Sequence, residues 1–241
     1  MTNGVDPNDI FHNGGWYNRN GSGPNTPLLP NSYTWTTKPS AASNANMVAL
    51  MSDVGSGTSG MGGGNLFISN GVRWKPAGGN VTLDSVDTAN AGVANTTEQN
   101  LNPNHIAIPA GVIGVFDRLR LWVSVSKSST VDTATFNVRF GPLGTIADPI
   151  ISSFALTTTN QTDGVLLEYK RTAATTIQKQ GNAAGDTSYS GQNTGNYPAP
   201  VTIANPDSAS MFLSLCAVMT TGVEAATLQD YTFELWPTDS F

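Results

Sequence analysis

The chain has 241 residues, a formal net charge of −6 and only 12% charged residues, against about 25% in an average soluble domain. No stretch is basic enough to neutralise a nucleic-acid backbone, and no apolar run approaches the roughly 18 residues of a membrane span. We therefore expect neither nucleic-acid binding nor membrane insertion. The chain is rich in glycine, threonine and asparagine and poor in helix formers, which predicts an all-β fold with many turns.

Residues 1–46 are predicted to form an extended arm. Turn formers occur throughout this region, with prolines at positions 24, 27, 30 and 39. It also holds five aromatic residues, which a merely flexible tail would not normally carry: Phe11, Trp16, Tyr17, Tyr33 and Trp35. We predict that these aromatics are assembly contacts buried against a neighbouring protein. The alternative, which the sequence leaves open, is that the tail folds back onto its own domain.

Residues 47–79 are predicted to form a small β-hairpin module. Strands are expected at 47–54, 66–68 and 72–76, and the last two are joined by a turn that contains Asn70 and Gly71. Asn-Gly between two apolar segments is a strong hairpin signal, because both central residues of a type I′ turn need positive φ.

Residues 80–241 are predicted to form a jelly-roll-like β-sandwich. Apolar and polar residues alternate most clearly in four segments, which predicts strands with one face on a core: 119–126, 135–140, 165–170 and 231–236. Further strands are expected at 81–84, 105–108, 150–157, 175–179, 201–204 and 212–218. About ten strands separated by turn-rich loops are typical of a sandwich or a jelly roll.

Two tryptophans in these strands, Trp122 and Trp236, fall on the face opposite the leucines and valines. Large apolar side chains on the second face of a sheet indicate that this face is covered. The expected cover is a second sheet, the arm or another subunit. A platform on which sugars stack is the alternative, and packing is the interpretation that we favour.

The glycine-rich segment 181–197 is long for a connection in a sandwich. Long loops with aromatic residues often carry function. Tyr189, Asn193 and Tyr197 are therefore predicted to be receptor contacts, with a host surface glycan as the partner.

No cofactor or metal site is predicted. Residues 55–60 match G-x-G-x-x-G, but the glycines that follow at 62–64 leave no helix to face a pyrophosphate. His12 and His105 lack metal-ligand spacing with each other and with Cys216. Cys216 lies in the apolar run 211–219, where a buried and inert thiol is expected.

No catalytic residue is predicted either. Glu168 and Glu234 occupy outward strand positions, where carboxylates usually solvate a sheet face or pair with a cation such as Lys170 or Arg171. The D-x-x-D-x-x-N spacing that begins at Asp84 does not match the alternating ligands of a calcium loop.

Two stretches resemble structural proteins of bacteriophages. Residues 52–55 and 66–76, the latter Leu-Phe-Ile-Ser-Asn-Gly-Val-Arg-Trp-Lys-Pro, resemble a short module near the N-terminus of phage tail fibres. Its pattern is Val-Gly followed by Ser-Asn/Asp-Gly-x-x-Trp-x-Pro. The second stretch is similar to jelly-roll head domains of fibre-like or capsid-decorating virion proteins. It comprises 108–111, 117–122, 132–135 and 148–151, with 189–191 and 230–235 extending the likeness.

The resemblance covers roughly residues 50–238 and implies a homotrimer located on the virion. It carries over no catalytic residue and no cofactor. Residues 1–20 have neither the charged start nor the apolar core of a signal peptide, so synthesis in the host cytoplasm is expected. The expected partners are other virion proteins, of the tail or of the capsid.

The sequence thus favours a non-enzymatic virion structural protein, and among these a short trimeric tail fibre. In that role the N-terminal region attaches to the particle and the β domain faces the host surface. The first alternative is a capsid decoration or cement protein. The second is a glycan-degrading tailspike-type enzyme. A bacterial carbohydrate-binding module would need an aromatic platform that the sequence does not reveal.

Overall fold

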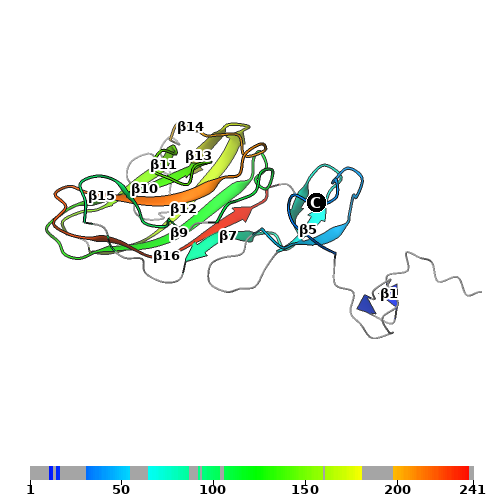
Figure 1. Cartoon of the computed structure of the whole chain (residues 1–241), viewed down its shortest axis with the longest axis horizontal. Helices are drawn as coiled ribbons and strands as arrows, with labels where there is room; N and C mark the ends of the chain where they lie inside the picture. Colours follow the sequence, from blue (N-terminus) through cyan, green and yellow to red (C-terminus); the bar gives the residue numbers. More distant parts are fainter. Residues whose placement is uncertain are drawn as a thin grey trace, which may run out of the picture.

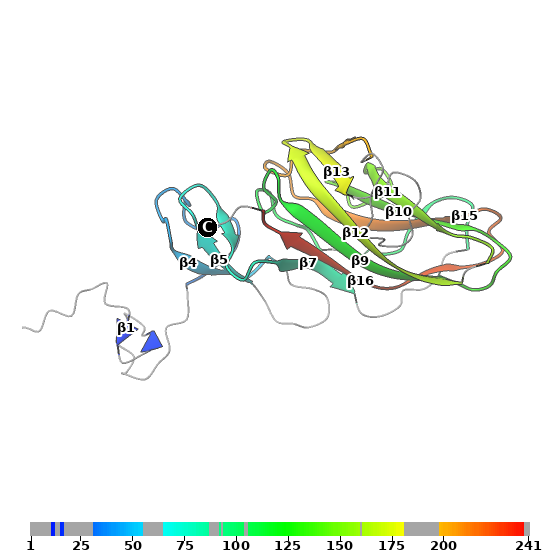
Figure 2. The same ribbon diagram turned by 180° about the vertical axis from the view of Figure 1, so that it is seen from behind.

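The computed structural model describes residues 31–54, 65–86, 92, 94–103, 106–159, 161–180 and 198–238, together with the backbone of two short strands near the N-terminus. The described residues form strands and turns, which confirms the all-β prediction, and none of them belongs to a helix able to cross a membrane. Figure 1 shows an elongated sandwich with a smaller sheet at one end, and Figure 2 shows the same arrangement from behind.

The strand bounds place the sandwich between residues 81 and 236 and the smaller sheet between residues 32 and 76. The strands are β1 (Phe11–His12), β2 (Gly15–Trp16), β3 (Ser32–Tyr33), β4 (Val48–Met51), β5 (Asn65–Ser69), β6 (Trp74–Pro76), β7 (Val81–Val86), β8 (Gln99–Asn100), β9 (Arg118–Lys127), β10 (Ala134–Gly141), β11 (Ile150–Leu156), β12 (Thr162–Ala173), β13 (Thr176–Gln180), β14 (Val201–Thr202), β15 (Phe212–Met219) and β16 (Ala226–Trp236).

The sandwich consists of a four-stranded sheet, β11-β10-β15-β8, and a six-stranded sheet, β14-β13-β12-β9-β16-β7. Its antiparallel pairs are nested along the chain: β10 pairs with β11, β9 with β12, β8 with β15 and β7 with β16. Eight strands paired in this nested order over two sheets form a jelly-roll-like sandwich, as predicted from the sequence. The hairpin partner of β12, β13, extends the larger sheet and β14 forms its edge.

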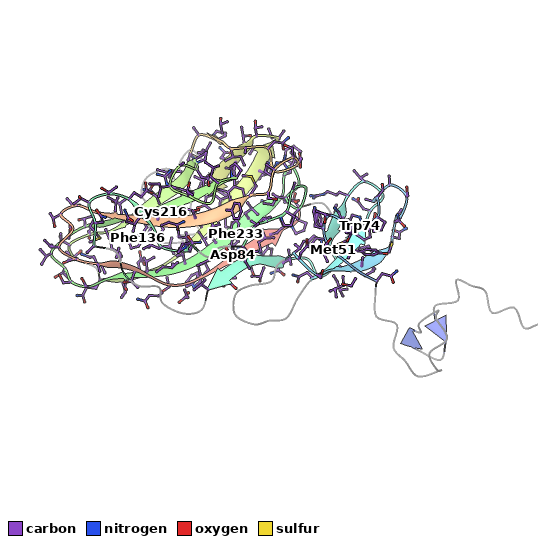
Figure 3. All side chains as sticks on the ribbon, in the orientation of Figure 1. Met51, Trp74, Asp84, Phe136, Cys216 and Phe233 are labelled. Atoms are coloured by element: carbon purple, nitrogen blue, oxygen red, sulfur yellow. The ribbon has the colours of Figure 1, made fainter. Side chains whose placement is uncertain are left out.

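The core lies between the two sheets and follows the period-two pattern of the sequence. In β9, Leu119, Leu121, Val123 and Val125 are buried, whereas the residues between them reach the surface. Phe140 of β10 meets Phe233 of β16 edge to face, with ring centroids 6.0 Å apart, so the aromatic rings join the two sheets. Figure 3 labels Phe233 between the ribbons of the sandwich.

The smaller sheet has the order β3-β4-β5-β6, with β3 parallel to β4 and the other pairs antiparallel. We call β3 to β6 and their connections, residues 31–76, the N-terminal module. Its buried apolar residues include Ala49, Met51, Phe67 and Trp74. The Trp74 indole donates a hydrogen bond to the Pro39 carbonyl oxygen, 2.9 Å away, so this core also anchors the segment between β3 and β4.

The β5–β6 hairpin is present, but its turn differs from the predicted two-residue type I′ turn. Strand pairing ends at Ser69 and Trp74, which leaves four residues in the connection. Gly71 has positive φ (83°), whereas Asn70 does not. The Asn70 side-chain oxygen instead accepts hydrogen bonds from the backbone N–H groups of Val72 and Arg73, at 3.0 and 2.9 Å. Asparagine here closes the turn with its side chain rather than with a left-handed backbone.

The N-terminal module is joined to the sandwich through the loop that precedes β9. The Arg73 guanidinium binds both carboxylate oxygens of Asp117, each at 2.7 Å, and Asp117 is 1% exposed. The Asp117 carboxylate also accepts the backbone N–H of Gly114 at 2.8 Å. A Cβ at Gly114 would lie 1.6 Å from a guanidinium nitrogen of Arg73, so only glycine leaves room for this ion pair.

A second anchor of the junction is Trp35, which the sequence assigned to the arm. Its side chain is 5% exposed and packs edge-on against Phe67, with ring centroids 5.3 Å apart. Its indole N–H donates a hydrogen bond to the Ala110 carbonyl oxygen of the sandwich at 2.6 Å. Trp35 is therefore buried within its own chain, which corresponds to the fold-back alternative for this residue.

Most predicted strands occur close to their expected limits, with one exception in the described residues. The strand expected at 105–108 is reduced to an isolated bridge between Ile108 and Met211. After this bridge the chain turns at residues 110–113, and Val112 and Ile113 are buried there. Burial of these apolar residues against the sandwich replaces the strand pairing that the sequence pattern suggests.

Candidate binding surface

The outer face of the six-stranded sheet carries two exposed tryptophans. Trp122 of β9 is 48% exposed and Trp236 of β16 is 37% exposed. The covered face expected from the sequence is therefore not found among the described residues, because neither the second sheet nor the N-terminal module lies over these two side chains. The second sheet packs on the opposite face, where the leucines and valines of β9 are buried.

The position of Trp122 depends on the absence of a side chain in the neighbouring strand. Trp122 is paired with Leu166 of β12 on one side and with Thr232 of β16 on the other. A Cβ on Gly164, two residues before Leu166, would lie 3.3 and 3.5 Å from two atoms of the Trp122 ring. One side of the indole thus lies over Gly164, where no side chain projects from the sheet. The other side of the indole faces the surface.

Trp236 is held in place by Glu234 and Arg120, which lie opposite each other on β16 and β9. Its indole N–H donates to the Glu234 carboxylate at 2.9 Å, and the Arg120 guanidinium lies over its ring, 4.3 Å from the centroid. Arg120 also binds one carboxylate oxygen of Glu168, through Nε at 2.9 Å and Nη2 at 2.6 Å. Asn80 donates to the second Glu234 oxygen at 3.2 Å. Arg120, Trp122, Gly164, Glu168, Glu234 and Trp236 are together called the tryptophan face.

The pairing of Glu168 corrects one sequence expectation. Lys170 and Arg171 were expected as its partners, but Lys170 lies near the Phe116 ring and Arg171 points into the protein. Arg171 is 1% exposed and binds Asp207 through two nitrogens, at 2.7 and 2.6 Å. Strand register explains the difference, since Glu168 of β12 lies directly opposite Arg120 of β9.

The predicted assembly contacts are placed only in part. Tyr33 is half-buried and packs against the hydrophobic core. The side chains of Phe11, Trp16 and Tyr17 lie outside the described residues, as do the predicted receptor contacts Tyr189, Asn193 and Tyr197. Phe11 and Trp16 are paired across the short β1–β2 ladder, as far as the backbone is described.

A buried charged cluster holds together two loops at the end of the sandwich farthest from the N-terminal module. Glu224 accepts hydrogen bonds from the Ser129 hydroxyl and the Val131 backbone N–H, and Lys127 Nζ lies 3.5 Å from its other oxygen. Asp132 accepts hydrogen bonds from the loop after β15, including the hydroxyl of Thr221 at 2.9 Å. These hydrogen bonds lower the pKa of both carboxyl groups against the opposing effect of burial.

Neither a metal centre nor a calcium loop is found in the described part of the chain, where no group of three or more His, Cys, Asp and Glu residues could hold a metal ion. Asp84 lies in the core, where it accepts hydrogen bonds from the Tyr231 hydroxyl at 2.8 Å and from the Ile106 backbone N–H at 3.3 Å. Asp87, Asn90 and His105 lie outside the described residues.

Cys216 is fully buried, as the sequence predicts. Burial raises the pKa of its thiol to about 12, so the reactive thiolate is scarce at neutral pH. We expect no reaction with a chromogenic disulfide reagent at pH 8 in the native state and complete reaction in guanidinium chloride. The Cys216→Ser variant is the blank. Rapid reaction of the native protein would show that the site is accessible.

The sequence did not identify the tryptophan face as an exposed site. The sequence pattern placed Trp122 and Trp236 on the face opposite the core residues, but it did not show which side chains lie beside them. Register between β12, β9 and β16 brings Glu168, Arg120 and Glu234 into one row, and this register depends on pairing between distant segments. Gly164 carried no visible signal, since a lone glycine in a strand has several uses.

Comparisons with known proteins give little likeness. No family model matches the sequence, and no curated protein matches it. Among solved structures, the fold is similar to the CBM2 module of the evolved Dit of Lactobacillus casei BL23 phage J-1. The identity is 12%, the match covers 56% of this chain and 69% of that chain, and the TM-score is 0.29. A likeness at this level carries no argument about function.

Proposed function

We propose that the chain is a non-enzymatic structural protein of a bacteriophage particle, and specifically a short trimeric tail fibre. The observation that supports this proposal is the junction between the N-terminal module and the sandwich. Arg73 belongs to the segment that resembles the fibre module, and Asp117 belongs to the segment that resembles virion head domains. Their two-pronged ion pair joins the two segments directly.

In this proposal the N-terminal region attaches the chain to the tail, and the sandwich faces the host surface. The alternative is a capsid decoration protein, in which the same N-terminal region binds neighbouring capsid subunits. The two locations differ in copy number, with roughly tens of copies for a fibre and hundreds for a decoration protein under closed particle symmetry.

We expect quantitative mass spectrometry of purified particles to find roughly tens of copies, in a multiple of three. Hundreds of copies would favour capsid decoration. Absence from particles would refute the proposed location altogether. Cross-linking of the purified protein should give a trimer as the largest species, and a monomer alone would contradict trimeric assembly.

Attachment is tested by a deletion that spares the junction. Because Trp35 and β3 are packed in the N-terminal module, removal of residues 1–30 should leave this module and the sandwich intact. We expect this variant to keep its unfolding transition and to be missing from particles. Incorporation at the level of the full chain would show that attachment does not need these residues.

A glycan-degrading enzyme is the second alternative. Glu168 and Glu234 lie on either side of Arg120, on strands about 9.6 Å apart, which is near the spacing of carboxyls in inverting glycosidases. Both carboxylates are hydrogen-bonded to neighbours on the sheet, however, and Arg120 occupies the row between them. We expect no release of reducing ends from host polysaccharide. Turnover that is lost in Glu168→Gln or Glu234→Gln would refute the non-enzymatic proposal.

A further inference from the structure

We propose that the tryptophan face binds a neutral glycan, with the exposed side of Trp122 packed against a sugar ring. This inference rests on the proposed function only for the setting, which is display of the sandwich toward a cell surface. It departs from the sequence interpretation, which favoured packing for both tryptophans and placed receptor contacts in segment 181–197.

Trp122 has the geometry of a platform for a sugar ring. Its ring leans over Gly164, where a Cβ would come within 3.3 Å of it, so the indole is supported from below by the sheet. Nearly half of the side chain remains exposed. A flat aromatic surface that is fixed in place presents an apolar area with little conformational freedom to lose. The C–H groups on one side of a pyranose ring match such a surface.

Polar side chains surround the Trp122 ring on the sheet. Ser124, two residues after Trp122 in β9, and Thr232, the register partner of Trp122 in β16, both carry hydroxyl groups. One step further, Asp230 lies opposite Ser124 and Glu234 lies opposite Arg120. An apolar platform with a few hydrogen-bonding groups at its edge is the usual composition of a small-ligand site. A sugar that covers the Trp122 ring can donate hydroxyl hydrogen bonds to the carboxylates beside this ring.

The charge around Trp122 decides which kind of glycan fits. Three carboxylates border Trp122 in the neighbouring strands, those of Glu168, Asp230 and Glu234. The nearest cation, Arg120, is bound by Glu168 through two nitrogens and lies over the Trp236 ring. An anionic sugar on Trp122 would meet these three carboxylates, because the other cations of this face, Arg118 and Lys170, lie in the row of Trp236 and not beside Trp122. The charge around Trp122 is therefore complementary to a neutral sugar that donates hydroxyl hydrogen bonds.

Trp236 offers a second aromatic contact for a longer chain. Its register partner is Arg118, four residues along β9 from Trp122, which corresponds to about 13 Å along the strand. Arg120 and Glu234 hold its ring on the sheet. An oligosaccharide laid along β9 would touch Trp122 first and Trp236 at its other end.

The test uses the full chain on an array of neutral and uronate- or sialate-containing oligosaccharides. We expect binding to neutral glycans, and a Kd for the best one that rises at least about tenfold in Trp122→Ala. Gly164→Val keeps every polar group and fills the space under the ring, so it should also weaken binding. Val223→Ala, which trims a 69% exposed side chain at the far end of the sandwich, is the matched control and should bind as the parent does.

Three outcomes would overturn the inference: no binding on the array, preference for anionic glycans, or binding that Trp122→Ala leaves unchanged. A fourth is self-association through this face, seen in sedimentation as an oligomer that Trp122→Ala dissociates. Failure here is distinguishable from failure of the proposed function. A chain found in particles without glycan binding refutes only the glycan site, whereas a glycan-binding chain absent from particles refutes only the virion role.

Discussion

Replacement of Trp35 by alanine is expected to lower the free energy of unfolding by about 3–5 kcal/mol. The indole is 5% exposed, meets Phe67 edge-on and donates a hydrogen bond to Ala110 at 2.6 Å. Its removal would leave a cavity between the N-terminal module and the sandwich and a carbonyl oxygen without its donor. Denaturant unfolding followed by circular dichroism measures the change.

Trp122→Ala is the matched control, because it removes the same side chain from an exposed position. We expect it to change the unfolding free energy by no more than about 1 kcal/mol. If Trp35→Ala cost no more than this control, Trp35 would not be part of the junction. The prediction that it is an outward assembly contact would then regain its support.

Replacement of Arg73 by alanine is expected to cost about 2–4 kcal/mol. The loss leaves the Asp117 carboxylate, which is 1% exposed, with one hydrogen bond from Gly114 and without its cation. The expected cost is smaller than that of breaking a fully buried pair, because the Arg73 side chain is itself 21% exposed. Limited proteolysis should show earlier cleavage in the connection between residues 76 and 81.

A double-mutant cycle with Asp117→Asn separates the ion pair from other effects of each change. We expect the destabilisation of the double variant to be clearly smaller than the sum of those of the two single variants, because either substitution alone already removes the ion pair. Additivity within about 0.5 kcal/mol would mean that the two side chains do not interact in solution. The junction would then rest on Trp35 alone.

The sequence was informative wherever the relevant pattern is local. Alternation in β9, β10, β12 and β16 predicted strands whose observed limits differ by a few residues, because a period of two depends only on neighbouring residues. The buried thiol of Cys216 followed from its apolar run for the same reason. The sandwich was predicted from the number of strands and the turn content, and the order in which the strands pair was not predicted.

The remaining features depend on contacts between distant segments. Because Trp122 and Trp236 are large apolar residues, the sequence predicted that their face is covered. They are exposed because the second sheet packs on the opposite face of the six-stranded sheet. Arg120 could have been assigned to several carboxylates, and strand register selected Glu168. The type predicted for the Asn70 turn was wrong. A hydrogen bond to the Asn70 side chain closes this turn, so the Asn70 backbone does not need to be left-handed.

The nested strand order also has a consequence for how the protein becomes folded. β7 and β16 pair side by side although about 140 residues separate them, and the pairs inside them close progressively shorter spans. Such non-local pairing makes folding slow, and β7 cannot find its partner on the ribosome until 226–236 has emerged. We infer that the hairpin of β10 and β11 is available early, whereas the sheet edge at β7 closes last. During synthesis the unpaired edge of β9 is open to a second nascent chain.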